Sequence, residues 1–229
     1  MKNVLLVDKP AGWTSFDVVA KLRGSIRAQY TQQGVKPTKK QLRVGHAGTL
    51  DPFATGLLVV LLGEECKNAG DFLKLDKIYE ATIRLGSTSS TGDPEGEITA
   101  VSSVVPDENT VRTCLEAFVG TITQTPPAHS AIKIGGVRAY KLAREGKTVE
   151  VPSRQVTIHS LELLEYSYPD IRIRTHVGSG TYIRSLASDI GEALQTGAYC
   201  VALRRTKIAQ YDVANALSVE AAAVQLETS

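Results

Sequence analysis

The sequence predicts an α+β fold in which helices and loops flank a mixed, mostly antiparallel sheet. Strand-like and helix-like segments follow one another without regular βαβ alternation, which argues against a doubly wound parallel sheet. No internal period recurs, so a solenoid is excluded. No long linker interrupts the 229 residues, and we therefore expect one domain over residues 1–229 with an insertion near 121–150.

The N-terminal elements follow from hydrophobic periodicity and capping residues. A short apolar run at 4–7 predicts a buried strand, and Thr14 and Ser15 are candidate N-caps for an amphipathic helix at 16–28. Residues 30–41 are polar, basic and interrupted by glycine and proline, so we expect a mobile loop there. Further elements are expected as strands at 57–62 and 78–85 and as a short helix at 67–73.

The C-terminal elements follow from the same signals. Pro106 and Asp107 predict the start of a helix that ends near residue 119, and Ser218 begins a last short helix. Residues 124–136 hold two prolines and two glycines, which is typical of a loop that orders on binding. The remaining elements are expected as strands at 156–164, 171–177 and 201–208 and as a helix at 181–194.

Composition excludes several classes of protein. Hydrophobic residues make up 42% of the chain and charged residues 22%, as in ordinary globular proteins. The longest apolar run, 57–62, is too short to span a bilayer, and no signal peptide is recognisable, so we expect a cytoplasmic protein without a membrane partner. The three cysteines and four histidines lack metal-ligand spacing, so we expect no metal, no disulfide and no cofactor.

Positive charge is segregated along the chain although the formal net charge is only +2. No acid lies between Asp17 and Asp51, whereas acids concentrate between Glu64 and Glu108. The bases of this acid-free segment are Lys21, Arg23, Arg27, Lys36, Lys39, Lys40 and Arg43. If the acid-free segments of the chain meet in space, they form a face suited to phosphates; if they scatter, they do not, and charge alone does not decide between the two.

Asp51 ends a glycine-rich turn, Gly45-His46-Ala47-Gly48-Thr49-Leu50-Asp51, and directly precedes Pro52. Pro52 disfavours the α region for Asp51, and the glycines allow another backbone to approach closely. Such a turn can present a carboxylate at the floor of a cleft. The residues alone favour the plainer alternative, an Asp that caps a helix begun by Pro52.

Several blocks of the chain, between about residues 4 and 207, resemble the TruB family of tRNA pseudouridine(55) synthases. The block at 44–56, which contains Gly45-His46-Ala47-Gly48-Thr49-Leu50-Asp51-Pro52, is a highly specific signature of that family. The other matching blocks lie at 7–19, 77–82, 85–86, 91–93, 124–140, 180–187, 189–191 and 203–205. The resemblance implies the pseudouridine synthase fold over a single catalytic domain, and a cofactor-free isomerisation of uridine in the T-arm loop of tRNA.

The resemblance also assigns catalytic residues. Asp51 matches the family's nucleophile, which must be ionised in a largely dry pocket and therefore needs a paired cation. Arg184 matches the arginine that supplies this charge, and Tyr79 matches the tyrosine that packs on the flipped base. Without the resemblance, Arg184 would be an exposed arginine in a first helical turn, and Tyr79 would be a core residue of an alternating strand.

Further positions match residues that bind the substrate. His46 matches a histidine that stacks against the flipped region of the RNA loop, and Leu203 matches a leucine that lines the pocket. Tyr182 is a candidate second aromatic wall, and Lys9 supports the fold around the active site. Lys133, with Arg138 and Tyr140, lies in what resembles the family's RNA-clamping insertion.

The chain also departs from the family pattern. His129 replaces the usual aromatic residue before Ser130, and Val177-Gly178-Ser179 replaces Cys-Ser-Lys. About twenty residues follow Lys207, so we expect no separate C-terminal domain of the PUA type. We expect tRNA as the partner and a monomer as the default. Two alternatives remain: a guide-dependent rRNA pseudouridine synthase, and an RNA-binding or tRNA-folding chaperone without catalysis.

Overall fold

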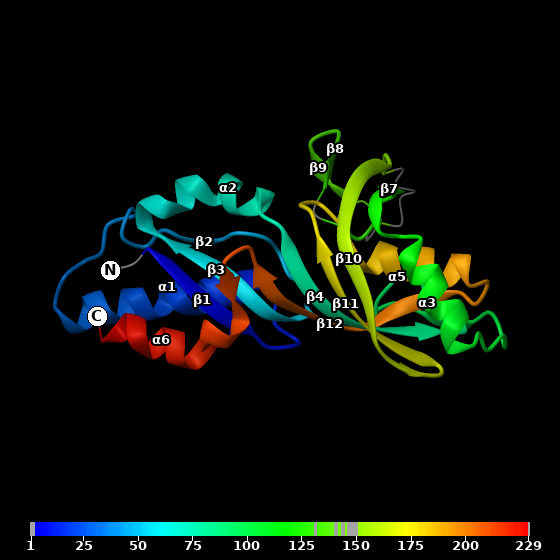
Figure 1. The fold of residues 1–229 in the computed structure, drawn as a ribbon. Helices are drawn as coiled ribbons and strands as arrows, with labels where there is room; N and C mark the ends of the chain where they lie inside the picture. Colours follow the sequence, from blue (N-terminus) through cyan, green and yellow to red (C-terminus); the bar gives the residue numbers. More distant parts are fainter. Residues whose placement is uncertain (1–2, 131, 140–141, 143–144, 146–150, 229) are drawn as a thin grey trace. The chain divides into compact units, whose positions relative to one another are not determined.

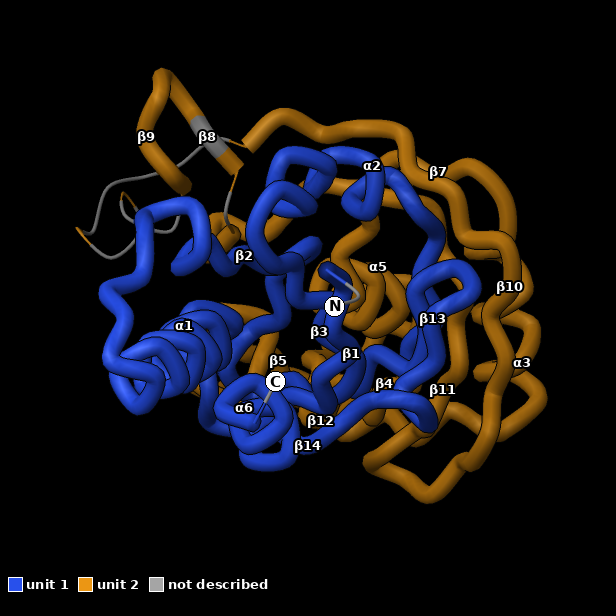
Figure 2. The backbone as a smooth tube through the Cα atoms, turned by 90° about the vertical axis from the view of Figure 1, so that its left-hand side faces the viewer, with its two compact units in different colours: residues 1–79, 204–229 blue, residues 80–203 orange. Residues whose placement is uncertain are grey.

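The computed structural model describes residues 3–130, 132–139, 142, 145 and 151–228. The chain divides into two units, which Figure 2 shows in different colours. Unit 1 combines residues 1–79 with 204–229, and unit 2 consists of residues 80–203. Strands β4 (Lys77–Leu85) and β12 (Ala198–Ile208) contribute residues to both units. Unit 1 is therefore built from both ends of the chain, whereas unit 2 is continuous.

The sheet of unit 1 has the strand order β14–β1–β3–β12, with β2 paired to β3 and β13 to β12. Strands β1 and β3 run antiparallel over six residue pairs, from Val4 opposite Leu61 to Lys9 opposite Gly56. The β1–β14 and β3–β12 pairings are parallel, so the sheet is mixed. The strand bounds are β1 Val4–Lys9, β2 Val44–His46, β3 Thr55–Leu62, β13 Tyr211–Asp212 and β14 Leu217–Ser218.

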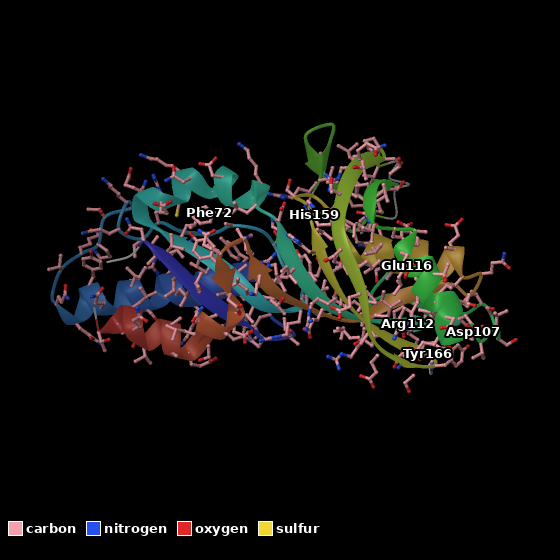
Figure 3. All side chains as sticks on the ribbon, in the orientation of Figure 1. Phe72, Asp107, Arg112, Glu116, His159 and Tyr166 are labelled. Atoms are coloured by element: carbon pink, nitrogen blue, oxygen red, sulfur yellow. The ribbon has the colours of Figure 1, made fainter. Side chains whose placement is uncertain are left out.

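Strand β3 is covered on both faces, which explains its uninterrupted apolar sequence. Leu58, Val60 and Leu62 pack in one core cluster, together with apolar residues of β1, α1 and α6. Leu57, Val59 and Leu61 pack in the other, beneath η1 (Gly63–Asn68) and α2 (Ala69–Lys74). The ring of Phe72 on α2 stacks on Tyr211 with centroids 6.0 Å apart, and Figure 3 labels Phe72 on this face.

Helices α1 (Ser15–Gln32) and α6 (Val219–Glu227) lie side by side against β1, as Figure 1 shows. Thr14 caps α1 in a reciprocal capping box with Asp17, and Ser218 caps α6. The two helices are also joined by a hydrogen bond of 2.8 Å from Ser25 Oγ to Glu227 Oε1. The sequence signals for both helix starts are confirmed.

Helix α1 ends later than expected, at Gln32 rather than near residue 28. Gly34 adopts a left-handed φ of +68°, Gly34 N donates to Thr31 O, and Val35 N donates to Tyr30 O at 2.9 Å. Because these bonds satisfy the last carbonyls of the helix, Gly34 acts as its C-terminal cap rather than as a break in a loop. The expected loop start at residue 30 is therefore wrong.

The sheet of unit 2 has the strand order β12–β4–β11–β10–β7. Strand β10 (Arg154–Ser167) pairs antiparallel with β11 (Asp170–Val177) and with β7 (Gly120–Gln124). Irregularities interrupt the β10–β11 register between Ile158 and Ser160 and between Leu163 and Glu165. A separate small sheet pairs β5 (Ser87–Ser89) with β6 (Ile98–Ala100).

Helices α3 (Glu108–Glu116) and α5 (Ile183–Ala193) complete unit 2. The side chain of Asp107 caps α3 by accepting from Thr110 N at 2.8 Å, as the sequence predicts. The hydroxyl of Tyr166, on β10, donates to Pro106 O and so fixes the start of this helix to the sheet. Figure 3 labels Asp107 and Tyr166 at this junction, with Arg112 and Glu116 further along α3.

The expected loop at 124–136 contains a hairpin at its end. Strands β8 (Lys133–Ile134) and β9 (Val137–Arg138) pair antiparallel across Gly135 and Gly136, both of which have positive φ. Two consecutive residues with positive φ are typical of tight hairpin turns. The strands are only two residues long, so no alternating pattern in the sequence could reveal them.

The expected α+β fold with a mixed sheet is confirmed, since most of the strand pairings are antiparallel and helices flank the strands. Over the described residues, no helix is both long and apolar enough to cross a bilayer. The expected organisation as one catalytic domain with an insertion near 121–150 stays a prediction.

Candidate functional site

Asp51 lies in a loop of unit 1 that is fixed to the first turn of α1. The hydroxyl of Ser15 accepts a hydrogen bond from Leu50 N at 2.8 Å and lies 3.2 Å from Leu50 O, to which it donates. Ser15 is 2% exposed and Leu50 is 3% exposed. The residue directly before Asp51 is therefore held through both of its backbone groups in a buried contact.

Lys9 anchors the other side of this loop. Its fully buried ammonium donates to Trp13 O at 2.6 Å, to Pro10 O at 2.9 Å and to Pro52 O at 3.4 Å. Gly12 N also donates to Pro52 O, at 2.8 Å. The residue directly after the candidate nucleophile is thus tied to the turn that follows β1.

Asp51 itself is partly exposed, and no helix begins after it. The chain bends so that Ala54 N donates to Asp51 O at 3.1 Å, and β3 begins at Thr55. The alternative that Asp51 caps a helix begun by Pro52 is therefore wrong. A carboxylate on a loop held at both flanking residues is positioned rigidly, which is what a nucleophile requires.

Arg205 holds the glycines of the same loop. Its side chain is 1% exposed, and it donates from Nε to Leu57 O at 2.8 Å and from a terminal nitrogen to Gly48 O at 3.0 Å. Gly56 has a φ of +100°, and a Cβ at this position would lie 2.3 Å from Arg205 O. Only glycine therefore permits the close parallel pairing of β3 with β12 at this point.

We expect Gly56→Ala to destabilise the protein by about 3 kcal/mol, because it combines a strained φ with a backbone overlap. The control is Gly120→Ala, where φ is +112° but nothing lies within 4 Å of the added Cβ. Urea unfolding of both variants measures the difference. Equal losses would mean that the contact with Arg205 contributes nothing.

Tyr79 and His46 also belong to unit 1. Tyr79 is 8% exposed and lies on the buried side of β4, whose residues alternate between buried and half-buried. This burial fits both roles that the sequence leaves open, a core side chain and the wall of a pocket. His46 is half-buried, ends β2 and pairs with Val60 of β3.

Arg184 lies in the first turn of α5 in unit 2, and it is buried rather than exposed. Its side chain is 4% exposed, and its terminal nitrogens donate to Asp93 Oδ2 and Thr91 O, each at 2.9 Å, and to His129 O at 2.7 Å. The alternative of an exposed helix arginine is wrong. The expected pairing of Arg184 with Asp51 stays a prediction, because the two residues belong to different units.

Hydrogen bonds hold the start of α5 against the end of β7. Gln124 is 1% exposed, accepts from Tyr182 N at 2.8 Å and donates to Tyr182 O at 3.1 Å. Ser185 Oγ donates to Thr125 O at 2.8 Å. The guanidinium of Arg154 lies 5.2 Å from the centroid of the Tyr182 ring, within the range of a cation–π contact. The candidate aromatic wall Tyr182 thus has a fixed backbone and a cationic neighbour.

The other candidate binding residues of unit 2 are less fully described. Leu203 is 8% exposed on β12. Lys133 and Arg138 lie on β8 and β9 of the hairpin, within the segment expected to clamp RNA. The side chain of Lys133 and all of Tyr140 lie outside the described residues.

A cavity of about 310 Å³ lies within unit 2, next to Arg184. Its lining is mostly polar and consists of Ser89, Ser90, Thr91, Gly92, Thr125, Pro126, Pro127, Ala128, His129, Arg184, Ser185, Ser188 and Asp189. Burial raises the pKa of Asp189 to about 6, and the nearby charge of Glu192 adds to this effect. Between about pH 4 and pH 6, the folded protein therefore keeps a proton on Asp189 that the unfolded chain has already released.

We expect Asp189→Asn to stabilise the protein by about 1 to 2 kcal/mol above pH 6, after allowance for solvent screening. The gain should disappear as the pH falls below the unfolded pKa of 3.8, since the carboxyl is then neutral in both states. Urea unfolding at pH 4 and pH 8 tests this. The control is Glu192→Gln at the exposed neighbour. This change removes only the smaller, electrostatic contribution to the raised pKa of Asp189. A gain that is the same at both pH values would contradict the prediction.

The sequence reasoning missed several residues that fix the candidate site. The sequence marks Ser15 as a candidate helix cap and places Arg205 and Gln124 in matching blocks, without a role in the site for any of the three. Asp93 lay in a matching block without a role, although it is the buried acid beside Arg184. Its partner lies 91 residues away in the chain, so no local pattern could reveal the pair.

Comparison with protein families identifies the chain. Residues 36–183 match the family model described as TruB family pseudouridylate synthase (N terminal domain). The chain belongs to the TruB family. Residues 184–227 match a second model of the family, described as tRNA pseudouridylate synthase B C-terminal domain.

Curated TruB relatives match nearly the whole chain. The tRNA pseudouridine synthase B of Burkholderia mallei is 43% identical over 221 residues, covering 96% of this chain and 69% of the relative. The protein of the same name from Parabacteroides distasonis is 44% identical over 222 residues, covering 95% of this chain and 90% of the relative. The protein of the same name from Thermobifida fusca is 43% identical over 232 residues, covering 97% of this chain and 75% of the relative.

Two solved complexes that contain Cbf5 share the fold. A Cbf5-Nop10-Gar1 complex matches 95% of this chain with a TM-score of 0.70 and 28% identity. The archaeal box H/ACA sRNP Nop10-Cbf5 complex matches 97% with a TM-score of 0.67 and 26% identity. This chain spans only about half the length of these solved chains, 52% and 53%.

Proposed function

We propose that this TruB-family protein isomerises uridine to pseudouridine in the T-arm loop of tRNA, with Asp51 as the nucleophile. The observation that carries the proposal is the 43–44% identity to proteins named tRNA pseudouridine synthase B, over 95–96% of this chain. The anchored loop around Asp51 supports it, since a nucleophile has to be held in one position.

The reaction breaks the bond between C1′ and N1, turns the uracil and joins C1′ to C5. The hydrogen on C5 leaves and N1 gains one, so the product is an isomer and no co-reactant is consumed. Asp51 attacks the sugar or the ring as a carboxylate, which requires it to be ionised at neutral pH. Arg184 supplies the positive charge that keeps it ionised in a dry site.

The target uridine has to leave its stack to reach Asp51. Tyr79 packs on the flipped base, Tyr182 and Leu203 line the pocket, and His46 contacts the flipped region of the RNA loop. The burial of Tyr79 and Leu203, both 8% exposed, supports pocket-lining roles because such side chains are already desolvated. Lys9 supports the loop around Asp51, and the hairpin that carries Lys133 contacts the RNA.

The enzyme meets its substrate in the cytoplasm and works as a monomer on tRNA alone. A guide-dependent role is less well supported, because identity to the Cbf5 chains is 26–28%, against 43–44% to the tRNA enzymes. We therefore assign the protein to free tRNA rather than to a guide complex.

The test incubates the purified protein with an unmodified tRNA transcript and no guide RNA. Pseudouridine is then mapped by a chemical reaction that stops reverse transcription at the modified base. We expect product at one uridine of the T-arm loop. Refolding of tRNA without product would favour the chaperone alternative, and product that appears only with a guide RNA would favour the guide-dependent one.

A further inference from the structure

A cluster of cations follows the C-terminal end of α1 in unit 1. We call residues 36–43 the basic turn; Lys36, Lys39, Lys40 and Arg43 are its charged members, and all four are exposed. The turn lies within the acid-free segment between Asp17 and Asp51, so no neighbour in the sequence offsets its charge. None of these side chains lines the cavity next to Arg184, and none is a partner in the hydrogen bonds described above for the loop that carries Asp51.

The basic turn is ordered by its own hydrogen bonds. Thr38 N and Thr38 Oγ1 each donate to Gln41 Oε1 at 2.8 Å, and Gln41 N donates to Thr38 Oγ1 at 3.3 Å. Leu42 N donates to Thr38 O at 3.2 Å, and the Leu42 side chain packs against the core of unit 1. The expectation of a mobile loop stays a prediction, while these bonds favour one defined turn, in which the backbone of Lys39 and Lys40 needs little further ordering on binding.

The charge of the basic turn is only partly balanced. Glu64 is shared by Lys40 at 3.5 Å, by Arg43 at 3.8 Å and by Lys67. Hydrogen bonding to Lys67 and the charge of Lys40 hold the pKa of Glu64 below its usual value. Within the described part of the chain, Lys36 and Lys39 form no ion pair, so the surface keeps an excess of positive charge.

We propose that the basic turn binds phosphates of the RNA substrate outside the pocket for the target uridine. The inference rests on the proposed function. Asp51 follows Arg43 by only eight positions, so the two Cα atoms lie within about 29 Å of each other. One RNA that reaches Asp51 can therefore also reach the turn.

The composition of the turn favours a phosphate backbone over a protein surface. Lysines on flexible stems act as point charges toward phosphates, and they do not read base edges as a bidentate arginine does. Protein interfaces are instead centred on aromatic or apolar anchors, whereas the turn itself contains no exposed large apolar residue and Val35 directly precedes it in the sequence. Binding here adds affinity that does not depend on RNA sequence, as expected of contacts that position a substrate.

The experiment compares the wild-type protein with the variant Lys36→Ala/Lys39→Ala/Lys40→Ala. The affinity for unmodified tRNA is measured at several salt concentrations, and pseudouridine formation is measured at limiting and saturating tRNA. Loss of three phosphate contacts should reduce the slope of log K against log salt by about 2 to 3, and affinity at 0.1 M salt by about tenfold or more. KM should rise correspondingly while kcat stays unchanged.

Two control variants separate local from general charge effects. Lys36→Arg/Lys39→Arg/Lys40→Arg keeps the charge and should keep the salt slope. Arg112→Gln/Arg172→Gln/Arg174→Gln removes three exposed, ion-paired cations from unit 2 and should change the slope less than the lysine variant does. An unchanged slope in the lysine variant, or an equal change in both charge-removing variants, overturns the inference. Wild-type activity and its loss on changing Asp51 test the proposed function separately.

Discussion

Asp51→Asn should lower the rate of pseudouridine formation on the order of 10⁴-fold or more, while tRNA still binds. The amide has nearly the shape of the carboxylate, so the anchored loop around it is preserved. It lacks the negative charge, and therefore it can neither attack the substrate nor stabilise a cationic sugar. Loss of a nucleophile affects the chemical step rather than substrate binding, and effects of this size are usual for such residues.

Single-turnover assays at saturating tRNA measure this loss, and a binding assay confirms that the complex still forms. The matched control is Asp71→Asn on α2, an exposed aspartate whose carboxylate lies 3.8 Å from the ammonium of Lys74. That variant should retain full activity. Substantial product from the Asp51 variant, at rates near those of the control, would show that another group is the nucleophile.

Asp93→Asn should destabilise the protein by about 3 kcal/mol, because it removes the acid from a buried ion pair. The side chains of Asp93 and Arg184 are only 5% and 4% exposed, and their charged atoms are 2.9 Å apart. Thr91 O and His129 O remain as acceptors, but neither offsets the full charge of the guanidinium. Activity should fall as well, since Arg184 then adopts its position less firmly.

Urea unfolding measures the change in the free energy of unfolding, and the exposed pair of Arg84 and Asp170 is the control. Its Nε–Oδ1 distance of 2.8 Å is similar, but the side chains are 41% and 34% exposed. Solvent screening should limit the cost of Asp170→Asn to about 1 kcal/mol or less. A cost for Asp93→Asn no larger than this would mean that burial of the first pair has no energetic consequence.

Local signals predicted the parts of this fold that depend on neighbouring residues. Thr14, Asp107 and Ser218 each cap a helix through the backbone amide three positions ahead, which a sequence can show directly. The uninterrupted apolar run of β3 likewise predicts a buried strand, because it consists of consecutive residues. The end of α1 was missed because Gly34 has the same composition signal whether it breaks a loop or caps a helix.

The candidate site was predictable only where a motif marks it. The glycine turn and the resemblance of the block at 44–56 to the TruB family mark Asp51 as the nucleophile. Without that resemblance, the residues around Asp51 favour a helix cap. Its supports come from far away in the chain: Ser15 lies 35 positions from Leu50, and Lys9 lies 43 positions from Pro52. Such contacts depend on how the elements pack, which no local pattern contains.

The division of unit 1 between both ends of the chain has a consequence for biosynthesis. Residues 80–203 form unit 2 without any later part of the chain, so this unit can acquire its internal contacts while translation continues. Strand β14 and helix α6, which pair with β1 and pack on α1, emerge from the ribosome afterwards. The unit that carries Asp51 is thus completed after unit 2, and a nascent chain that has not yet reached Arg205 lacks the contact of this side chain with Gly48 O in the loop that carries Asp51.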